Sequence, residues 1–219
     1  MFIMGLDLSG PSNHKDTSLA ICTNEEGTLQ VMELLEGVSD VTILERVEYY
    51  SRLGEVAIGI DSPLSYEDGG GDRPSDRALR QFIVSIGMKS GSIMPPTMNR
   101  MVYLTLRGIR LTREIEANFT GVKIAEVHPG AILGARIVHD SQWLDHILNY
   151  KSEPRRLGEL LDWLEDQGLQ HIPRGRVTTS HCFDALVAAF GAWHWADPSL
   201  GPAWLFPKEL PLHPYDFCC

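Results

Sequence analysis

The same short pattern occurs twice in this chain of 219 residues, once from Met4 to Asp7 (MGLD) and again from Ile58 to Asp61 (IGID). Each copy is an apolar run that contains a glycine and ends in an aspartate, and turn-forming residues follow it. Short apolar runs without helical spacing are typical of buried β-strands. The pattern therefore predicts two interior strands that each carry an aspartate at the carboxyl end.

Other segments add strands and helices around these two. Residues 17–23 and 28–34 are expected to complete an antiparallel meander with the first strand, and residues 122–127 to form a fifth strand. Right-handed crossovers place the Asp61 strand parallel to the Asp7 strand and next to it. The sequence thus predicts a mixed α/β sheet of five strands, three antiparallel and two parallel, flanked by helices. Helices are expected at about residues 40–53, 75–88, 97–118, 140–150, 153–167 and 180–196.

The length fits a single domain, residues 1–219, that carries two insertions. We expect a basic helical insertion after the fourth strand, at about residues 66–118, and a second helical insertion at about residues 136–175. The sequence contains no run of 18 apolar residues, and its beginning has no basic segment before an apolar one. A cytoplasmic protein without a membrane partner is therefore expected.

Several classes of chemistry are disfavoured by what the sequence lacks. The four cysteines contain no pair at zinc-finger spacing, which argues against a structural zinc site or a disulfide framework. The eight histidines form no H-E-x-x-H motif, and no glycine-rich phosphate loop followed by Lys and Ser or Thr occurs. Zinc-protease and P-loop chemistry are therefore not expected.

Charge is distributed unevenly along the chain. The formal net charge of −10 by itself argues against a nucleic-acid partner. Residues 73–113, however, contain eight basic residues and one acidic residue. Arginines recur there at every third position along two predicted helices, either as a solvated face or as contacts to the phosphate backbone of a nucleic acid. These arginines are Arg77, Arg80, Arg107, Arg110 and Arg113.

Two aspartates at one edge of a sheet repel each other and lose hydration, so we expect a positive charge beside them. Hard divalent cations such as Mg²⁺ or Mn²⁺ prefer carboxylate oxygens. Gly5 and Gly59 share the strand faces of Asp7 and Asp61 and leave room for another element. The final helix fits there, because it carries alanines for close packing and Asp184 as a third carboxylate.

Three further side chains are candidates for the same site. His181 lies three positions before Asp184 and shares its helix face. Glu126 and His128 lie two positions apart near the end of the strand predicted at 122–127. We expect the two histidines to support the metal ligands and Glu126 to act in catalysis, with ordinary structural hydrogen bonding as the alternative for Glu126 and His128.

Four motifs together resemble those of an uncharacterised prokaryotic family of predicted nucleases with a ribonuclease H-like fold. They are GLD at 5–7, GIDSP at 59–63, EVHP at 126–129 and DALVAA at 184–189, and they span nearly the whole chain. In ribonuclease H and the Holliday-junction resolvases, the first strand is central and the fourth lies beside it. Acidic residues on these strands and on the last helix bind the metals.

The resemblance implies that Asp7, Asp61 and Asp184 are metal ligands in a nuclease that uses Mg²⁺ or Mn²⁺ to hydrolyse phosphodiester bonds of DNA or RNA. Glu126 would join these three residues in catalysis, and the arginines would contact the substrate phosphates. His181 stands where resolvases often have a second acid, so the number of cations, one or two, stays open.

Two other functions stay open at this point. Actin-like ATPases and sugar kinases share the sheet topology, and the segment from Ser9 to Asp16, with Lys15, would then hold a nucleotide phosphate. A non-catalytic nucleic-acid-binding module of the same fold is the second alternative. The sequence does not distinguish DNA from RNA as the substrate, and it does not indicate an oligomeric state.

Overall fold

The structure is a computed structural model that describes residues 1–137 and 141–219. Within these residues eight strands form one mixed sheet. In chain order they are β1 (Phe2–Asp7), β2 (Ser18–Glu25), β3 (Thr28–Glu36), β4 (Val56–Asp61), β5 (Lys123–Val127), β6 (Leu169–Gln170), β7 (Leu205–Phe206) and β8 (Asp216–Cys218). Across the sheet they lie in the order β6-β3-β2-β1-β4-β5-β8-β7. The prediction of five strands is wrong, because β6, β7 and β8 have two or three residues each and are too short to show an alternating pattern.

Seven α-helices accompany the sheet in the described residues, and none is long and apolar enough to cross a membrane. They are α1 (Asp40–Ser51), α2 (Pro74–Ser85), α3 (Val102–Asn118), α4 (Pro129–Ile137), α5 (Ser141–Asn149), α6 (Pro154–Asp166) and α7 (Ser180–Ala196). Residues 138–140, which belong to the predicted second insertion and include the start of the helix predicted at 140–150, lie outside the described residues.

Helix α4 is absent from the helices expected from the sequence. Pro129 occupies the first helical position, where its missing N–H costs nothing. The side chain of His128 caps this helix, since its Nδ1 accepts a hydrogen bond from the backbone N–H of Ala131 at 3.1 Å.

Strand β1 is central and pairs antiparallel with β2 and parallel with β4. The register of the parallel pair sets Gly5 opposite Gly59 and Asp7 opposite Asp61. The predicted adjacency of the two aspartate-ending strands is therefore confirmed. Both aspartates lie at the carboxyl edge of the sheet, where ligands of open α/β sheets commonly bind.

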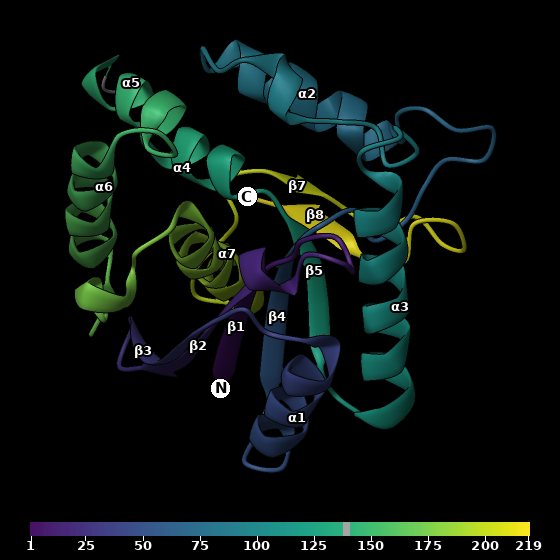
Figure 1. Ribbon diagram of the computed structural model, residues 1–219, viewed down its shortest axis with the longest axis horizontal. Helices are drawn as coiled ribbons and strands as arrows, with labels where there is room; N and C mark the ends of the chain where they lie inside the picture. Colours follow the sequence, from purple (N-terminus) through teal and green to yellow (C-terminus); the bar gives the residue numbers. More distant parts are fainter. Residues whose placement is uncertain (138–140) are drawn as a thin grey trace.

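Helices cover both faces of the sheet, and each face has its own apolar core. The face that carries Ile3 packs against α7, α4 and α6, whereas the face that carries Met4 and Leu6 packs against α1 and α3. Figure 1 shows α7 to one side of β1 and β4 and α3 to the other. Asp7 and Asp61 belong by strand alternation to the α7 face.

Helix α7 packs against the middle of the sheet at very short distance. A Cβ atom added to Gly5 would lie 2.1 Å from the backbone oxygen of Ala185 and 2.1 Å from the backbone nitrogen of Ala189. One added to Gly59 would lie 2.7 Å from the backbone oxygen of Ala188. The prediction that these glycines make room for the final helix is confirmed, and this contact brings the first turn of α7 to the aspartates.

Candidate functional site

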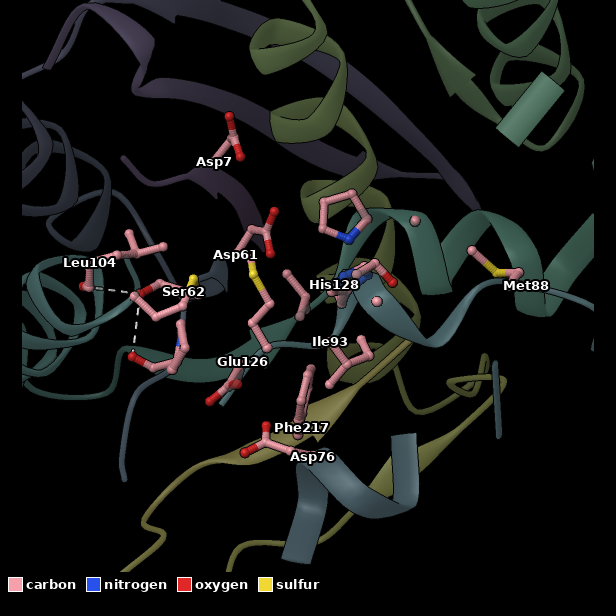
Figure 2. A pocket seen from close by; sticks show the side chains of 18 of the residues that line it. Asp7, Asp61, Ser62, Asp76, Met88, Ile93, Leu104, Glu126, His128 and Phe217 are labelled. Atoms are coloured by element: carbon pink, nitrogen blue, oxygen red, sulfur yellow. Dashed lines mark hydrogen bonds between the residues drawn. The ribbon is translucent and has the colours of Figure 1, made fainter. Parts of the chain in front are cut away.

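A cavity of about 640 Å³ opens at the carboxyl ends of β1, β4 and β5. Asp7 and Asp61 form part of its wall, and the segment 88–104 contributes a largely apolar part that includes three methionines. Lys151 also lines it. Figure 2 shows the carboxyl groups of Asp7 and Asp61 on one side of the cavity, with Met88 on another. The cavity is large enough to hold a small organic ligand or part of a larger one.

The carboxyl groups of Asp7 and Asp61 act on each other. Burial raises the pKa of Asp61 well above its ordinary value, and the charges of Asp7 and Asp184 raise it further. The pKa of Asp7 is also raised, mainly by burial and then by Asp184, although its hydrogen bond to His181 opposes the rise. Asp184 therefore acts electrostatically on both Asp7 and Asp61.

His181 is positioned by the first turn of α7 and contacts Asp7. The distance from its Nδ1 to Oδ2 of Asp7 is 2.7 Å. This hydrogen bond raises the pKa of His181, and the charge of Asp7 adds to the effect. With Nδ1 protonated, the ring donates to the carboxylate and fixes the orientation of Asp7.

Asp184 lies on the second turn of α7 and is 1% exposed. Its Oδ1 accepts a hydrogen bond of 2.5 Å from the hydroxyl of Tyr150, and its Oδ2 lies 2.8 Å from Nζ of Lys151. Burial raises the pKa of Tyr150 well above its ordinary value, and Asp184 raises it further, so the hydroxyl keeps its proton and donates. Both oxygens of Asp184 thus contact protein groups.

The carboxylates of the site determine which cation it suits. In the residues that the structure describes, no group of three or more His, Cys, Asp or Glu side chains is placed to hold a metal ion. Asp7 and Asp61 nevertheless offer two adjacent carboxylates whose repulsion a cation would relieve. Carboxylate oxygens and space for water suit Mg²⁺ or Mn²⁺. The arrangement fits a cation held by two carboxylates, with Asp184 engaged elsewhere.

Glu126, predicted to be catalytic, is buried in an ion-pair network. Its Oε2 and Oε1 lie 2.7 and 2.5 Å from the guanidinium of Arg73, and Oε2 also accepts a hydrogen bond of 2.9 Å from the backbone N–H of Leu64. Arg73 binds Asp76 at the same time, at 2.7 Å. The network ties the start of α2 to the end of β5, and both oxygens of Glu126 are occupied by it.

His128 lies in the wall of the cavity, where burial and then the charge of Lys151 lower its pKa. A neutral ring agrees with its contact to Ala131, because only an unprotonated Nδ1 can accept that hydrogen bond. The role that the structure shows for His128 is therefore that of a helix cap beside the cavity.

The five arginines predicted to contact nucleic acid divide into three groups. Arg107 is 3% exposed, and its guanidinium binds Asp40 at 2.7 Å and the backbone oxygen of Ser9 at 2.9 Å, so it contacts the protein rather than a substrate. Arg80 pairs with Asp72 at 2.6 Å. The side chains that remain exposed are those of Arg77, Arg110 and Arg113.

Helix geometry explains why Arg107 is buried while Arg110 and Arg113 are exposed. A step of three residues advances about 300° around an α-helix, so positions three apart drift by about 60° at each step. Over the two steps from Arg107 to Arg113 the drift reaches about 120°, which moves a side chain from the buried flank to solvent.

Sequence reasoning missed Tyr150, Lys151 and Arg73 as parts of this site. Tyr150 and Lys151 follow α5, and nothing in their spacing connects them with Asp184. Arg73 was counted as part of a basic segment, although Asp76 at the third position of the following helix is a capping signal that places both side chains at one helix start.

Comparison with protein-family models gave a match over residues 5–210 to the family described as "Protein of unknown function (DUF429)". Comparison with the curated proteins and with the solved structures gave no match. The matched region includes Asp7, Asp61, Asp184 and the helical segments between them. Since it covers most of the sequence, the chain belongs to the DUF429 family.

Proposed function

We propose that the chain is a nuclease of ribonuclease H-like fold that hydrolyses phosphodiester bonds of DNA or RNA with the help of Mg²⁺ or Mn²⁺. The observation that carries the proposal is the pairing of Asp7 with Asp61 at the rim of a 640 Å³ cavity, within the electrostatic reach of Asp184. A fold tolerates such a concentration of acidic groups when a cation neutralises it.

The order of the first five strands supports the ribonuclease H-like part of the proposal. Strand β1 lies between β2 and β4, which agrees with the arrangement that the sequence resemblance implies, and β5 lies on the other side of β4. The last helix, α7, brings Asp184 to the edge where β1 and β4 end. Strands β6, β7 and β8 extend the two sides of this arrangement without interrupting it.

Asp7 and Asp61 would hold the cation. When bound, such a cation lowers the pKa of a coordinated water and stabilises negative charge on phosphoryl oxygens. His181 keeps the carboxylate of Asp7 in place through its hydrogen bond. Lys151 adds a positive charge on the cavity wall, where a phosphate would enter.

The apolar part of the cavity would exclude water from one side of the bound substrate. Arg77, Arg110 and Arg113 remain available on the surface for phosphates at a distance from the reacting group, because none of them is buried. Contacts of that kind hold a backbone without selecting a sequence.

A cleavage assay tests the proposal. Purified protein would be incubated with single-stranded, duplex, hybrid and branched substrates in Mg²⁺, in Mn²⁺ and with a chelator. We expect metal-dependent cleavage that Asp7→Asn and Asp61→Asn each reduce by at least about 100-fold, since each removes a ligand charge. Asp166→Asn is the matched control, because Asp166 is an exposed aspartate outside the site.

The proposal fails if both site variants cleave as fast as the wild type. It also fails if the protein binds nucleic acid and cleaves none of the substrates with either cation. That second result would favour the non-catalytic binding module.

A further inference from the structure

Lys151 occupies a special place beside the acidic cluster. Its Nζ lies 2.8 Å from Oδ2 of Asp184, and its side chain, 63% exposed, lines the same cavity as Asp7 and Asp61. Burial raises the pKa values of Asp7 and Asp61, and the charge of Lys151 opposes part of the rise in both, so its field reaches the whole cluster. The lysine thus supplies part of the positive charge that the three carboxylates need.

Asp184 is the carboxylate least able to exist without a partner, since it is 1% exposed. An unpaired charge at that depth would be strongly destabilising. The hydroxyl of Tyr150 and the ammonium of Lys151 satisfy its two oxygens from adjacent positions of the chain. This arrangement differs from that of Asp7 and Asp61, for which no lysine or arginine provides a direct ion pair in the described residues.

Two-metal nucleases place two cations roughly 3.5 to 4 Å apart, and each neutralises part of a carboxylate cluster. In this chain an ammonium group already stands beside the third carboxylate. We propose that Lys151 supplies the positive charge that a second divalent cation supplies elsewhere, so that the chain binds a single divalent cation, at Asp7 and Asp61. The inference rests on the proposed function, because it concerns the cation of that same site.

The geometry gives Lys151 a second task in the same reaction. An ammonium has three N–H donors, and the contact with Oδ2 of Asp184 uses one of them. In the described part of the chain only Asp184 forms an ion pair with this ammonium, so its remaining donors can meet a phosphate oxygen in the cavity that Lys151 lines. Lys151 therefore acts as a fixed cation for the substrate phosphate while it neutralises Asp184.

Counting bound Mn²⁺ tests the proposal without any substrate. Free Mn²⁺ would be measured by electron paramagnetic resonance during titration of the wild type and of Lys151→Met, Lys151→Arg and Lys89→Met. Lys89 is the matched control, because it is an exposed lysine that lines the same cavity. Among the described residues the ion pair of Asp184 is with Lys151 and not with Lys89. Circular dichroism confirms that each variant is folded.

We expect one Mn²⁺ per chain in the wild type, in Lys151→Arg and in Lys89→Met. Lys151→Met should bind a second Mn²⁺, because removal of the ammonium frees Asp184. Its first Mn²⁺ should bind at least about tenfold more tightly, since a nearby positive charge is removed. The double variant Lys151→Met, Asp184→Asn should return to one Mn²⁺, which identifies Asp184 as the ligand of the second.

Two Mn²⁺ in the wild type would overturn the inference even if Lys151→Met fails to fold. So would a single Mn²⁺ in a folded Lys151→Met variant that matches Lys89→Met in affinity. In either case cleavage that depends on Asp61 leaves the proposed function standing. If the wild type binds no Mn²⁺ and Asp61→Asn changes nothing, both the inference and the proposed function fail.

Discussion

Asp7 and Asp61 are register partners on adjacent parallel strands, so two like charges end side by side at one edge of the sheet. Burial, and then the charge of Asp7, raise the pKa of Asp61 well above its ordinary value. Such a pair lowers the free energy of unfolding whenever both groups are ionised and no cation is bound. This pair therefore lowers the stability of the fold when no cation is bound.

The first prediction concerns this cost. In chelator at neutral pH, Asp61→Asn should be more stable than the wild type by roughly 1–4 kcal/mol, the energy of a charge pair at about 4 Å. For a chain of this size each kcal/mol corresponds to about 2–4 °C in the melting temperature. Mn²⁺ should raise the melting temperature of the wild type and leave that of the variant nearly unchanged. Equal responses of the two proteins to Mn²⁺ would contradict the assignment.

The second prediction concerns the glycine beneath the site. Gly5→Ala should lower the free energy of unfolding by about 3 kcal/mol or more, because the new methyl group would overlap the backbone of α7. Gly158→Ala is the control, since Gly158 lies within α6 with no atom in reach of an added Cβ. That change should increase stability by roughly 0.5–1 kcal/mol. Urea denaturation measures both, and a neutral effect of Gly5→Ala would refute the close contact.

The third prediction concerns the buried ion-pair network. Arg73→Met leaves the carboxylates of Glu126 and Asp76 without their cation, so it should lower the free energy of unfolding by about 3–5 kcal/mol. Arg77→Met, on the exposed flank of the same helix, should change it by less than about 0.5 kcal/mol. Thermal unfolding of the two variants gives the comparison. Similar melting temperatures would show that the network contributes little.

The fourth prediction uses a histidine far from the acidic cluster. Burial, and then the charge of Arg136, lower the pKa of His194 to about 4. A base with a depressed pKa in the folded state takes up a proton more readily when the chain unfolds. Stability is therefore retained above about pH 6.5 and falls as the pH drops from about 6.5 to about 4.

Over this pH window His194 should change the free energy of unfolding by about 2 kcal/mol. This is less than the full pKa difference would give, because part of the ring is exposed to solvent. His194→Asn should flatten the pH dependence in that range, since asparagine cannot take up the proton. Chemical denaturation at several pH values measures the slope. An unchanged slope in the variant would assign the effect to other groups.

The fifth prediction concerns the two exposed arginines of α3. Replacing Arg110 and Arg113 by Met should make the salt dependence of nucleic-acid binding shallower, by about one unit of log K against log salt for each phosphate that the variant no longer binds. Arg176→Met is the control, because Arg176 is exposed on another part of the chain. Fluorescence anisotropy over a range of salt concentrations gives the slopes. If the slopes of the variants do not differ, Arg110 and Arg113 do not bind the substrate phosphates.

The central part of the fold could be predicted because its signals are local. A glycine and an aspartate two positions apart on a buried strand share a face, and the same arrangement at Gly59 and Asp61 predicts where the two strands meet. The clearance for α7 follows from the absence of side chains at these glycines. Within the sheet the edges were missed, since very short strands carry no periodic signal.

The partners of the carboxylates could not be predicted. Lys151 and Asp184 are 33 positions apart, and their contact depends on how the segment after α5 folds back on α7. The ion pair of Arg73 with Glu126 crosses 53 positions in the same way. Sequence spacing within one helix or strand cannot show contacts of this kind, because they are set by packing between elements.

The two sides of the cavity differ in how freely they can change. Asp7 lies two residues from Gly5, whose surroundings tolerate no added atom, so the acidic edge shares the rigidity of the core. The opposite side comes from the segment 88–104, which includes exposed residues, one 3-10 turn and the first residues of α3. Libraries that diversify this segment should therefore yield altered ligand preferences with the cation chemistry retained, whereas diversity at the sheet edge should yield mostly inactive proteins.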